Sequence, residues 1–168
     1  MARMIRGKLG EYVSSVIYAV VIFMLLYVFL WPVRIIGISM EPTLVHGDRV
    51  FVSRALAFVG AYERGDLVMM RVVNDSIDSG RYIIKRIIAS EGDVLLIEDG
   101  QVFINGEPLE FEAYIVGGLS LTLEDDMYFL IGDNSIYSVD SRDFGAVHRG
   151  NIRGKVLFRF WGGSVRID

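Results

Sequence analysis

The chain has 168 residues, a length that suits one domain, and it carries a formal net charge of −4 with two histidines and no cysteine. The absence of cysteine excludes a disulfide framework, a cysteine-ligated zinc site and a thiol nucleophile. Residues 32–168 hold fourteen basic and twenty acidic side chains. An acidic domain of this kind has no basic stripe for gripping nucleic acid, so we expect no nucleic-acid partner.

One segment near the N-terminus is far more apolar than the rest. Of the nineteen residues from Val13 to Trp31, seventeen are hydrophobic, and only Ser14 and Ser15 interrupt them. As a helix, the segment spans about 28 Å, close to the ~30 Å hydrocarbon core of a bilayer. A secretory signal has a shorter apolar stretch of ~7–15 residues, and a buried core helix usually has a polar face. We therefore predict one N-terminal transmembrane helix over residues 13–31.

The charges before this helix predict its orientation. Arg3, Arg6 and Lys8 face a single acid, Glu11. Basic residues in short flanking segments tend to stay in the cytoplasm. Residues 1–12 are therefore expected in the cytoplasm, and residues 32–168 on the far side of a cytoplasmic membrane that the chain crosses once.

After the helix the apolar residues come in short β-branched and aromatic runs, which are typical of strands. Asp99-Gly100 and Asn105-Gly106 are candidate hairpin turns, and a short helix is expected only at Val52–Ala61. We predict an all-β domain over residues 32–168, a curled or barrel-like antiparallel assembly. The last strand, Val156–Trp161, either packs in the core and closes this assembly or lies on the membrane surface. The other expected strands are Arg49–Val52, Leu67–Arg71, Tyr82–Ile88, Val94–Ile97, Val102–Ile104 and Met127–Ile131.

Ser39 lies eight residues after the apolar segment. Eight extended residues reach at most roughly 28 Å, so Ser39 is expected near the bilayer. Pro42 disfavours helical geometry at Glu41, which places the serine on an extended stretch or a turn. A nucleophilic serine needs a base, and the histidine candidates are His46 and His148. Neither has a persuasive orienting acid, and both also suit ordinary exposed loops.

Lys85 lies in the run Tyr82–Ile88, which is otherwise apolar except for one arginine. Strand alternation places Ile83 and Ile87 on the same face as the lysine. At an ordinary pKa of ~10.4 only ~0.1% of a lysine is neutral at pH 7.4, whereas a pKa of ~8 makes about one fifth neutral. A buried Lys85 therefore suits a general base. The alternative is a lysine on an edge strand with its stem buried and its ammonium in water.

The segment 132–145 is dense in hydroxyls and carboxylates. It is either a long surface loop or part of a polar site. Its aspartates Asp133 and Asp140 are candidate ion-pair partners for two arginines, Arg86 and Arg142. A serine of this segment is a candidate to hold a neutral lysine amine in line with Ser39.

Four motifs follow the apolar segment in order, and together with it they extend over most of the chain. Their sequence resembles that of the bacterial type I signal peptidases, membrane-anchored serine proteases with a Ser–Lys dyad. A lone Ser-Met-x-Pro is a weak signal, but four ordered motifs are strong. The motifs are Ser39-Met40-Glu41-Pro42-Thr43-Leu44 with Gly47-Asp48, then Lys85-Arg86 followed by Glu91-Gly92-Asp93, then Gly132-Asp133-Asn134, and last Ser138-Val139-Asp140-Ser141-Arg142.

The resemblance implies an all-β catalytic domain of coiled antiparallel sheets that removes signal peptides from exported preproteins, without metal or cofactor. Ser39 matches the nucleophile, Lys85 the general base and Ser138 the residue that orients the lysine. Gly37 stands where some members carry a serine hydroxyl, so the expected oxyanion donor is the backbone N–H of Ser39. The charged residues that match structural positions of the family are Arg86, Asp133, Asp140 and Arg142.

The substrates of this family carry small residues at the first and third positions before the cut. Shallow apolar pockets admit alanine there and exclude larger side chains. The resemblance implies a substrate that lies extended against the segments of Gly37 and Ile83. Each lining residue is equally suited to the domain core. The expected lining residues are Ile35, Met40, Leu44, Ile83 and Ile84.

Three other interpretations stay open from the sequence. Self-cleaving Ser–Lys proteins of the SOS-response repressor type share the catalytic fold, but they are soluble and carry a regulatory or DNA-binding arm. The mitochondrial inner-membrane peptidases are closer, and the anchor and motifs suit them too. A tethered β-domain that binds a partner without catalysis leaves the apolar setting of Lys85 unexplained.

Overall fold

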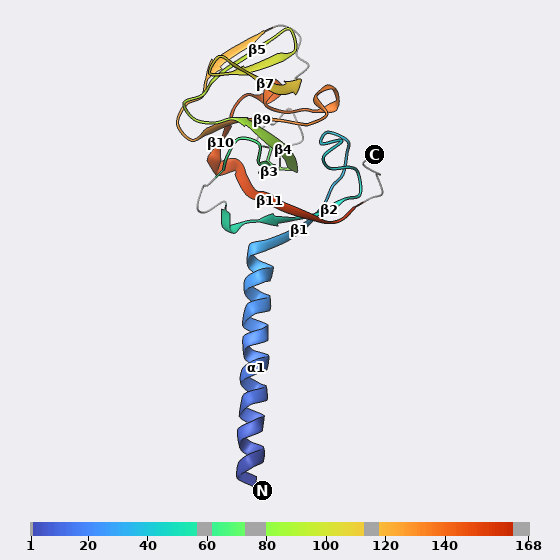
Figure 1. Cartoon of the computed structure of the whole chain (residues 1–168), viewed down its shortest axis with the longest axis vertical. Coiled ribbons are helices and arrows are strands. Elements are labelled where there is room, and N and C mark those ends of the chain that lie inside the picture. The colour runs from blue at the N-terminus through green and yellow to red at the C-terminus, as the bar shows by residue number, and fades with distance from the viewer. Residues whose placement is uncertain (1, 57–61, 73–79, 113–117, 163–168) are drawn as a thin grey trace.

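A long helix leads directly into a mostly β domain in the computed structural model, which describes residues 2–56, 62–72, 80–112 and 118–162 (Figure 1). Helix α1 spans Ala2–Phe29. The helix predicted over residues 13–31 therefore ends earlier, because Leu30 and Trp31 pair with Ser53 and Val52 as the start of strand β1. No helix within the described residues has the length and hydropathy needed to cross a membrane. The transmembrane role of residues 13–31 stays a prediction.

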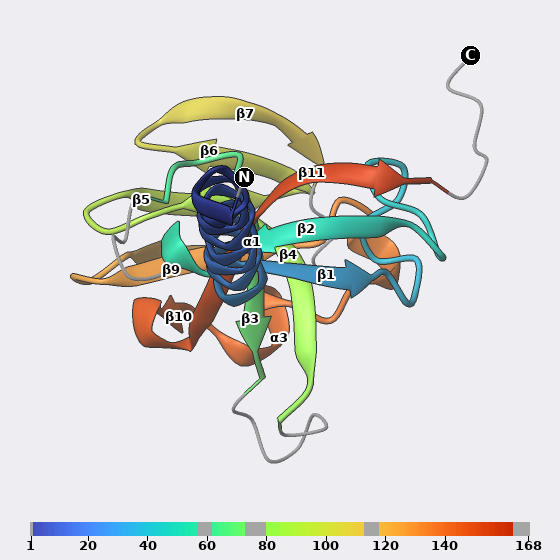
Figure 2. The same ribbon diagram turned by 90° about the horizontal axis from the view of Figure 1, so that it is seen from below.

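The strands of the described residues form two antiparallel sheets. The larger sheet has the order β1-β2-β11-β3-β4-β9-β10, and the smaller has the order β7-β6-β5-β8. In Figure 2, β1, β2 and β11 lie side by side next to the end of α1. The strands are β1 (Leu30–Arg34), β2 (Arg49–Ser53), β3 (Leu67–Arg71), β4 (Tyr82–Ala89), β5 (Val94–Glu98), β6 (Gln101–Ile104), β7 (Glu107–Glu112), β8 (Leu119–Thr122), β9 (Met127–Ile131), β10 (Val147–His148) and β11 (Ile152–Trp161). Short helical turns η1 (Ser135–Tyr137), α3 (Ser141–Phe144) and η2 (Arg149–Asn151) precede or follow β10.

The all-β prediction for this domain is confirmed in its main features. Both predicted hairpin turns are present: Asp99 and Gly100 have φ of 49° and 81°, and Asn105 and Gly106 have φ of 55° and 84°. Positive φ at both central residues is the geometry that twists a two-residue hairpin correctly. The short helix predicted at Val52–Ala61 is wrong at its start, because Val52 belongs to β2. Residues 57–61 lie outside the described part of the chain.

Strand β11 differs most from its prediction. It begins at Ile152 rather than Val156, and it lies between β2 and β3 in the middle of the larger sheet. In the described part of the chain that sheet is open, with β1 and β10 at its edges, so β11 does not close a barrel. Its outer residues are not core either: Phe158 is 53% exposed and Trp161 is 67% exposed.

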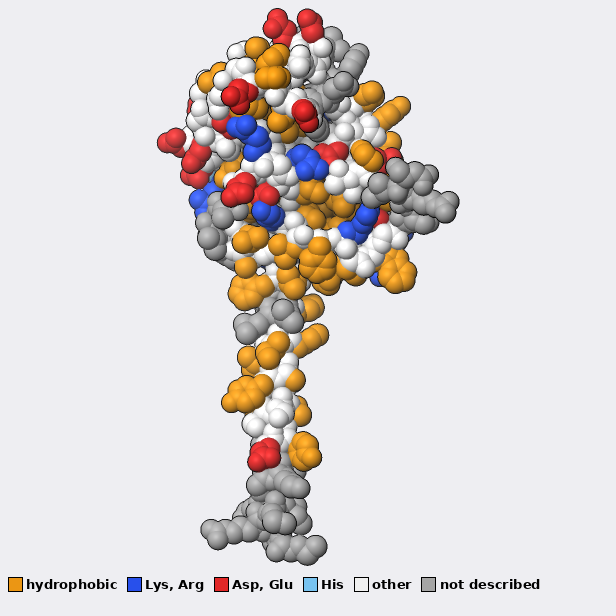
Figure 3. All heavy atoms as spheres, in the orientation of Figure 1, with side chains coloured by type: hydrophobic (Ala, Val, Ile, Leu, Met, Phe, Trp, Pro, Cys, Tyr) orange, Lys and Arg blue, Asp and Glu red, His pale blue; other side chains and the backbone are white. Residues whose placement is uncertain are grey.

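The exposed face of β11 forms an apolar surface at the helix end of the domain. The ring of Phe51 stacks on Phe160 at 4.3 Å between centroids and contacts Phe158 at 5.4 Å. Figure 3 shows apolar side chains gathered on the underside of the domain, next to the helix. We call this the aromatic surface, and it consists of Phe51, Leu157, Phe158, Phe160 and Trp161.

The buried core positions β4 and β9 next to each other. Ile87 of β4 and Leu130 of β9 are both fully buried in one apolar cluster. A second cluster joins the same two strands to the smaller sheet through Phe129 and Leu95. Because β4 pairs with β9 from Arg86 onward, the polar segment that follows β9 returns across Lys85.

Candidate active site

Lys85 lies on β4 and is buried. Val68 of the neighbouring strand β3 is directly opposite it. The residue is 3% exposed, so the interpretation of a lysine with its head in water is wrong. Its Nζ donates a hydrogen bond to Ser138 Oγ at 2.8 Å. Burial lowers the pKa of Lys85 to about 8, against the opposing effect of the Asp140 carboxylate. A substantial fraction of this amine is therefore uncharged near neutral pH.

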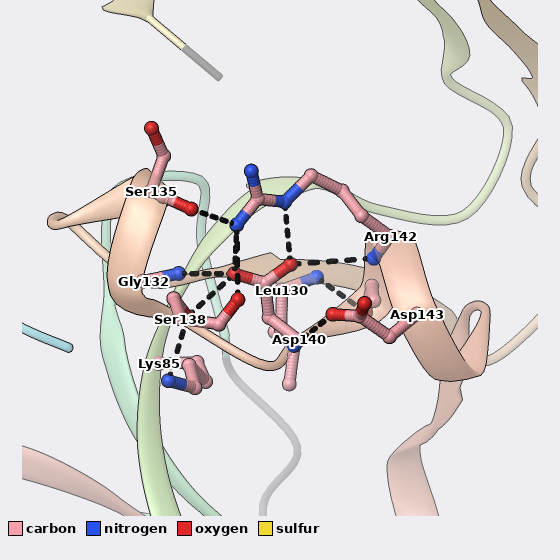
Figure 4. Close-up of polar contacts among 9 residues, drawn as sticks. Lys85, Leu130, Gly132, Ser135, Ser138, Asp140, Arg142 and Asp143 are labelled. Carbon is pink, nitrogen blue, oxygen red and sulfur yellow. Dashed lines mark hydrogen bonds and ion pairs between the residues drawn. The ribbon is translucent and has the colours of Figure 1, made fainter. Parts of the chain in front are cut away.

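Ser138 lies between Lys85 and Asp140, as Figure 4 shows. Ser138 Oγ donates to Asp140 Oδ2 at 2.6 Å. The Asp140 carboxylate also accepts from the backbone N–H of Gly132 at 3.0 Å. It is fully buried, and Arg142 neutralises it through two hydrogen bonds, Nε to Oδ1 at 2.8 Å and Nη2 to Oδ2 at 2.9 Å.

Local hydrogen bonds hold the 132–145 segment in a single shape. Asp140 is the N-cap of α3, and its own N–H donates to Asp143 Oδ2 at 2.9 Å, which completes a capping box. Arg142 Nη2 also donates to the carbonyl of Ser135 at 2.6 Å. The segment is therefore an ordered part of the site rather than a plain surface loop. Asp143 has no assigned role in the sequence analysis, although its three-residue spacing from Asp140 fits a capping box.

A second ion pair, which is partly buried, joins this segment to the strand of the lysine. Arg86 donates from Nε to Asp133 Oδ1 at 2.7 Å and from Nη2 to Oδ2 at 2.6 Å. The same guanidinium donates to the carbonyl of Gly65 and to the hydroxyl of Thr43. Arg86 thus connects β4, the segment after β9 and the turn that follows Ser39.

Ser39 lies in a turn after β1, as the sequence predicts, and its backbone contacts the same polar segment. Its carbonyl oxygen accepts from the N–H of Asn134 at 3.0 Å. Among the described residues, neither the N–H nor the hydroxyl of Ser39 has a hydrogen-bond partner. Both groups are therefore available to a ligand.

Gly132 is a residue that the sequence analysis quotes only as part of a motif. A Cβ at this buried position would clash with Ser138 Oγ and would lie 2.5 Å from the carbonyl oxygen of Ser39. Gly132 therefore lets the backbone of Ser39 and the hydroxyl that holds Lys85 approach the same point. Its φ is not positive, so no turn signal in the sequence reveals this role.

The residues expected to line substrate pockets divide between two places. Ile35, Met40 and Leu44 are buried in one cluster, and Ile84 packs against it. Ile83 instead packs against the cluster of Ile87 on the other side of the strand. Gly37 is exposed, with φ of 105° and nothing within 4 Å of the place where a Cβ would lie.

The two histidines are apart from the lysine. His46 Nδ1 accepts from the N–H of Gly37 at 3.2 Å, and His148 Nδ1 accepts from the N–H of Gly150 at 3.0 Å. Both side chains are exposed. In the part of the chain that the structure describes, neither histidine has a carboxylate partner.

The sequence is similar to those of several known proteins. The profile of the family described as signal peptidase, peptidase S26, matches residues 9–161. Signal peptidase I of Bacillus licheniformis is 32% identical over 173 aligned residues, which cover 93% of this chain and 90% of that protein. Signal peptidase I U of Bacillus subtilis is 33% identical and covers 77% of this chain and 74% of its own length.

Two further similarities come from a more distant source and from a crystal structure. Thylakoidal processing peptidase 1 of Arabidopsis thaliana is 32% identical over 77% of this chain and 42% of that protein. The crystal structure of a signal peptidase I from Enterococcus faecalis is 26% identical, with a TM-score of 0.47 over 58% of this chain and 97% of that one. The family profile and the Bacillus relatives extend over most of the sequence, and by that measure the chain belongs to the peptidase S26 family of signal peptidases.

Proposed function

We propose that this chain is a membrane-anchored endopeptidase that removes N-terminal signal peptides from exported preproteins, with Ser39 as nucleophile and Lys85 as general base. One observation carries the proposal. The Lys85 amine is buried, has a pKa of about 8, and is held by Ser138 in the segment that also binds the backbone of Ser39. The printed names of the Bacillus relatives support the substrate class.

The direction of the hydrogen bonds at Ser138 supports the role of the lysine. A serine hydroxyl has one proton, and Ser138 gives it to Asp140. Ser138 therefore accepts from Lys85, which uses one N–H of the amine. The lone pair of the neutral amine stays free to take the proton of Ser39 as its oxygen attacks the scissile carbonyl.

The remaining steps follow from the same pair of groups. The protonated Lys85 returns its proton to the leaving amine, and the acyl group stays on Ser39. A water molecule then gives a proton to Lys85 and attacks the ester carbonyl. Lys85 passes this proton to the Ser39 oxygen as the acyl group leaves, which restores the serine and the neutral amine. The free N–H of Ser39 is the proposed donor to the oxyanion of each tetrahedral intermediate.

An unpaired strand edge supports an extended substrate. Residues Tyr82 to Lys85 pair with β3 on one side, whereas β9 pairs with β4 only from Arg86 onward. Within the described residues, the other edge of this stretch has no strand partner. A preprotein that adds a strand here places its scissile bond beside Lys85.

The buried state of the apolar residues near Ser39 supports a preference for small substrate side chains. Ile35, Met40 and Leu44 are each at most 7% exposed, so their side chains already fill the space between the turn and the sheet. We therefore propose that the substrate pockets beside them are shallow. Ile83 and Ile84 face opposite sides of the strand and would contact alternate substrate residues.

Two features support the proposed membrane anchor: the apolar segment and the surface of the domain beside it. Along α1, large apolar side chains such as Val16 and Phe23 are more than 60% exposed. The aromatic surface lies at the same end of the molecule (Figure 3). Rings at that level suit the membrane–water interface, where tryptophan is enriched. With Arg3, Arg6 and Lys8 in the cytoplasm, the catalytic domain is extracytoplasmic.

The function is tested by incubating the full chain in detergent with a signal-bearing precursor and sequencing the N-terminus of the product. We expect one cut after a small residue, and no cut when that residue is changed to phenylalanine. The Ser39→Ala variant is expected to bind the precursor without cutting it, and Ser120→Ala, an exposed serine of β8, serves as the matched control. Equal cleavage by Ser39→Ala, or no cleavage of any such precursor, would contradict the proposal.

A further inference from the structure

A cleft of about 450 Å³ lies at the junction of the helix and the domain, and three arginines line it. They are Arg54, which follows β2, and Arg149 and Arg153 from η2 and β11. His148 and Asp126 complete the polar lining. This concentration of positive charge is unusual for a domain with fourteen basic and twenty acidic side chains. In the described part of the chain, no hydrogen bond or ion pair joins these residues to Lys85, Ser138 or Asp140.

Most of the positive charge in the cleft is not neutralised by the protein. Arg149 pairs with Asp126 at 3.6 Å, and both side chains are more than one third exposed. An exposed pair of this length contributes little. In the described part of the chain, Arg54 and Arg153 have no carboxylate partner. The cleft therefore has two arginines in excess over its carboxylates.

The position of Arg54 places the cleft at the end of the helix. Its backbone N–H donates to the carbonyl of Phe29, the last residue of α1, at 2.9 Å. Its guanidinium lies 5.3 Å from the ring centroid of Trp31. A tryptophan at this point suits the interface of a bilayer that contains α1. The cleft then faces the headgroup layer, an inference that rests on the membrane anchor of the proposed function.

We propose that this cleft binds the phosphate of an anionic phospholipid headgroup. Guanidinium groups match phosphate oxygens with pairs of parallel hydrogen bonds, and the two arginines without a carboxylate partner offer such pairs. The guanidinium of Arg54 also makes a cation–π contact with the ring of Trp31. A free phosphate ion offers the same chemistry, but the contact of Arg54 with the last residue of the helix favours the lipid.

The test uses the full chain in nanodiscs that contain spin-labelled phosphatidylglycerol or spin-labelled phosphatidylcholine. Electron paramagnetic resonance gives the fraction of each lipid held at the protein. Each basic residue at a membrane surface contributes about 1 kcal/mol, which is roughly a fivefold change in an equilibrium constant. We expect the wild type to prefer phosphatidylglycerol at least about fivefold, and Arg54→Gln/Arg153→Gln to show almost no preference.

The matched control is Arg34→Gln/Arg49→Gln, which removes the same charge from β1 and β2. These two arginines are paired with each other at one end of β1 and β2, and Leu30 and Ser53 are paired at the other end. All four arginines are exposed, so neither double variant is expected to change the melting temperature. The control should keep the lipid preference of the wild type. Equal loss in both variants would mean a general surface charge and would overturn the cleft as the site.

A second arm separates the possible sources of phosphate. Inorganic phosphate is titrated into the protein at constant ionic strength, and the lipid preference is measured again. A preference that persists supports a headgroup site. Two outcomes overturn the lipid site alone. One is an inserted protein that has no preference for phosphatidylglycerol, and the other is a cleft that binds inorganic phosphate in detergent as tightly as it binds phosphatidylglycerol. Protein that does not stay with the nanodiscs contradicts the anchor and the lipid site together, while precursor cleavage in detergent tests the peptidase independently.

Discussion

Ser138 Oγ donates its only proton to Asp140 Oδ2 over 2.6 Å. The same oxygen must therefore accept the 2.8 Å hydrogen bond from Lys85 Nζ. The carboxylate that fixes this direction is fully buried and is itself neutralised by Arg142. The protein alone therefore fixes which group donates in the hydrogen bond between Lys85 and Ser138, before any substrate binds.

Removing the Ser138 hydroxyl should affect turnover more than folding. Without its acceptor, the Lys85 amine loses the hydrogen bond that fixes its orientation, and in the proposed mechanism its lone pair would no longer be held ready for the proton of Ser39. We expect Ser138→Ala to lower kcat by about 10–100-fold, the range typical for loss of a group that orients a catalytic residue, with little change in KM. Ser138→Thr keeps the hydroxyl and should recover most of the activity. Wild-type kcat in Ser138→Ala would contradict the orienting role.

Changing Asp140 to asparagine should destabilise the fold. The substitution leaves the guanidinium of Arg142, whose side chain is 7% exposed, without its carboxylate. Breaking one side of a buried ion pair costs about 3–5 kcal/mol in free energy of unfolding. Asp126→Asn breaks the exposed pair with Arg149 and should cost under ~1 kcal/mol. Chemical denaturation measures both, and similar values for the two variants would be inconsistent with the buried pair.

If Lys85 is the general base, as proposed, kcat/KM depends on pH through the neutral form of its amine. Its pKa of about 8 means that the neutral fraction rises with pH up to that value and then levels. We expect kcat/KM to rise about tenfold per pH unit below the pKa and to reach a plateau above it. Lys85→Arg should be inactive at every pH, because a guanidinium does not lose its proton. A profile that is flat between pH 6 and 9 would rule out this base.

Replacing Lys85 with methionine should stabilise the protein while it abolishes cleavage. The pKa of Lys85 is about 8 in the folded chain and near 10.5 when exposed. Between these values the unfolded chain binds more protons, so stability rises with pH. The penalty is complete below pH 8 and absent above 10.5. We expect Lys85→Met to gain about 2 kcal/mol at pH 7, after the loss of one hydrogen bond, and to lose this advantage as the pH approaches 10.5.

Gly132→Ala tests whether Ser39 and Ser138 meet at this glycine. The added methyl would clash with Ser138 Oγ and lie 2.5 Å from the Ser39 carbonyl oxygen. We expect cleavage to fall at least about 100-fold, because misplacement by ~1 Å has effects of that size. In Gly118→Ala the methyl meets only Ile97 O at an ordinary 3.5 Å. Activity should there stay within about twofold of wild type. Equal activity of the two variants would disprove the close approach.

The strands that sequence patterning predicts are those with neighbours on both sides or a strongly apolar face. The four strands that it does not predict, β1, β7, β8 and β10, are the edges of the two sheets. Edge strands bury less and tolerate proline and charge, as Pro32 in β1 and Pro108 in β7 illustrate. Their sequences therefore have weak strand signals.

The candidate site likewise has residues that the sequence identifies and features that it does not. Ser39, Lys85 and Ser138 can be chosen from motifs, because each belongs to a short sequence that resembles the family. The burial of Lys85 cannot be predicted from the sequence, because a lysine on an edge strand and a buried lysine have the same sequence pattern. The part played by Gly132 depends on two segments that are far apart in the chain, and only coordinates bring them together.

The central claim is that an uncharged amine at position 85 is available near neutral pH, and it can be measured directly. The chain has only three lysines, Lys8, Lys85 and Lys155. Titration of 13C-labelled lysine Cε resonances by NMR, with Lys85→Met to assign the signal, gives each pKa. The account predicts that the Lys85 signal titrates at about 8. A Lys85 signal that titrates near the ~10.4 of an ordinary lysine would contradict it.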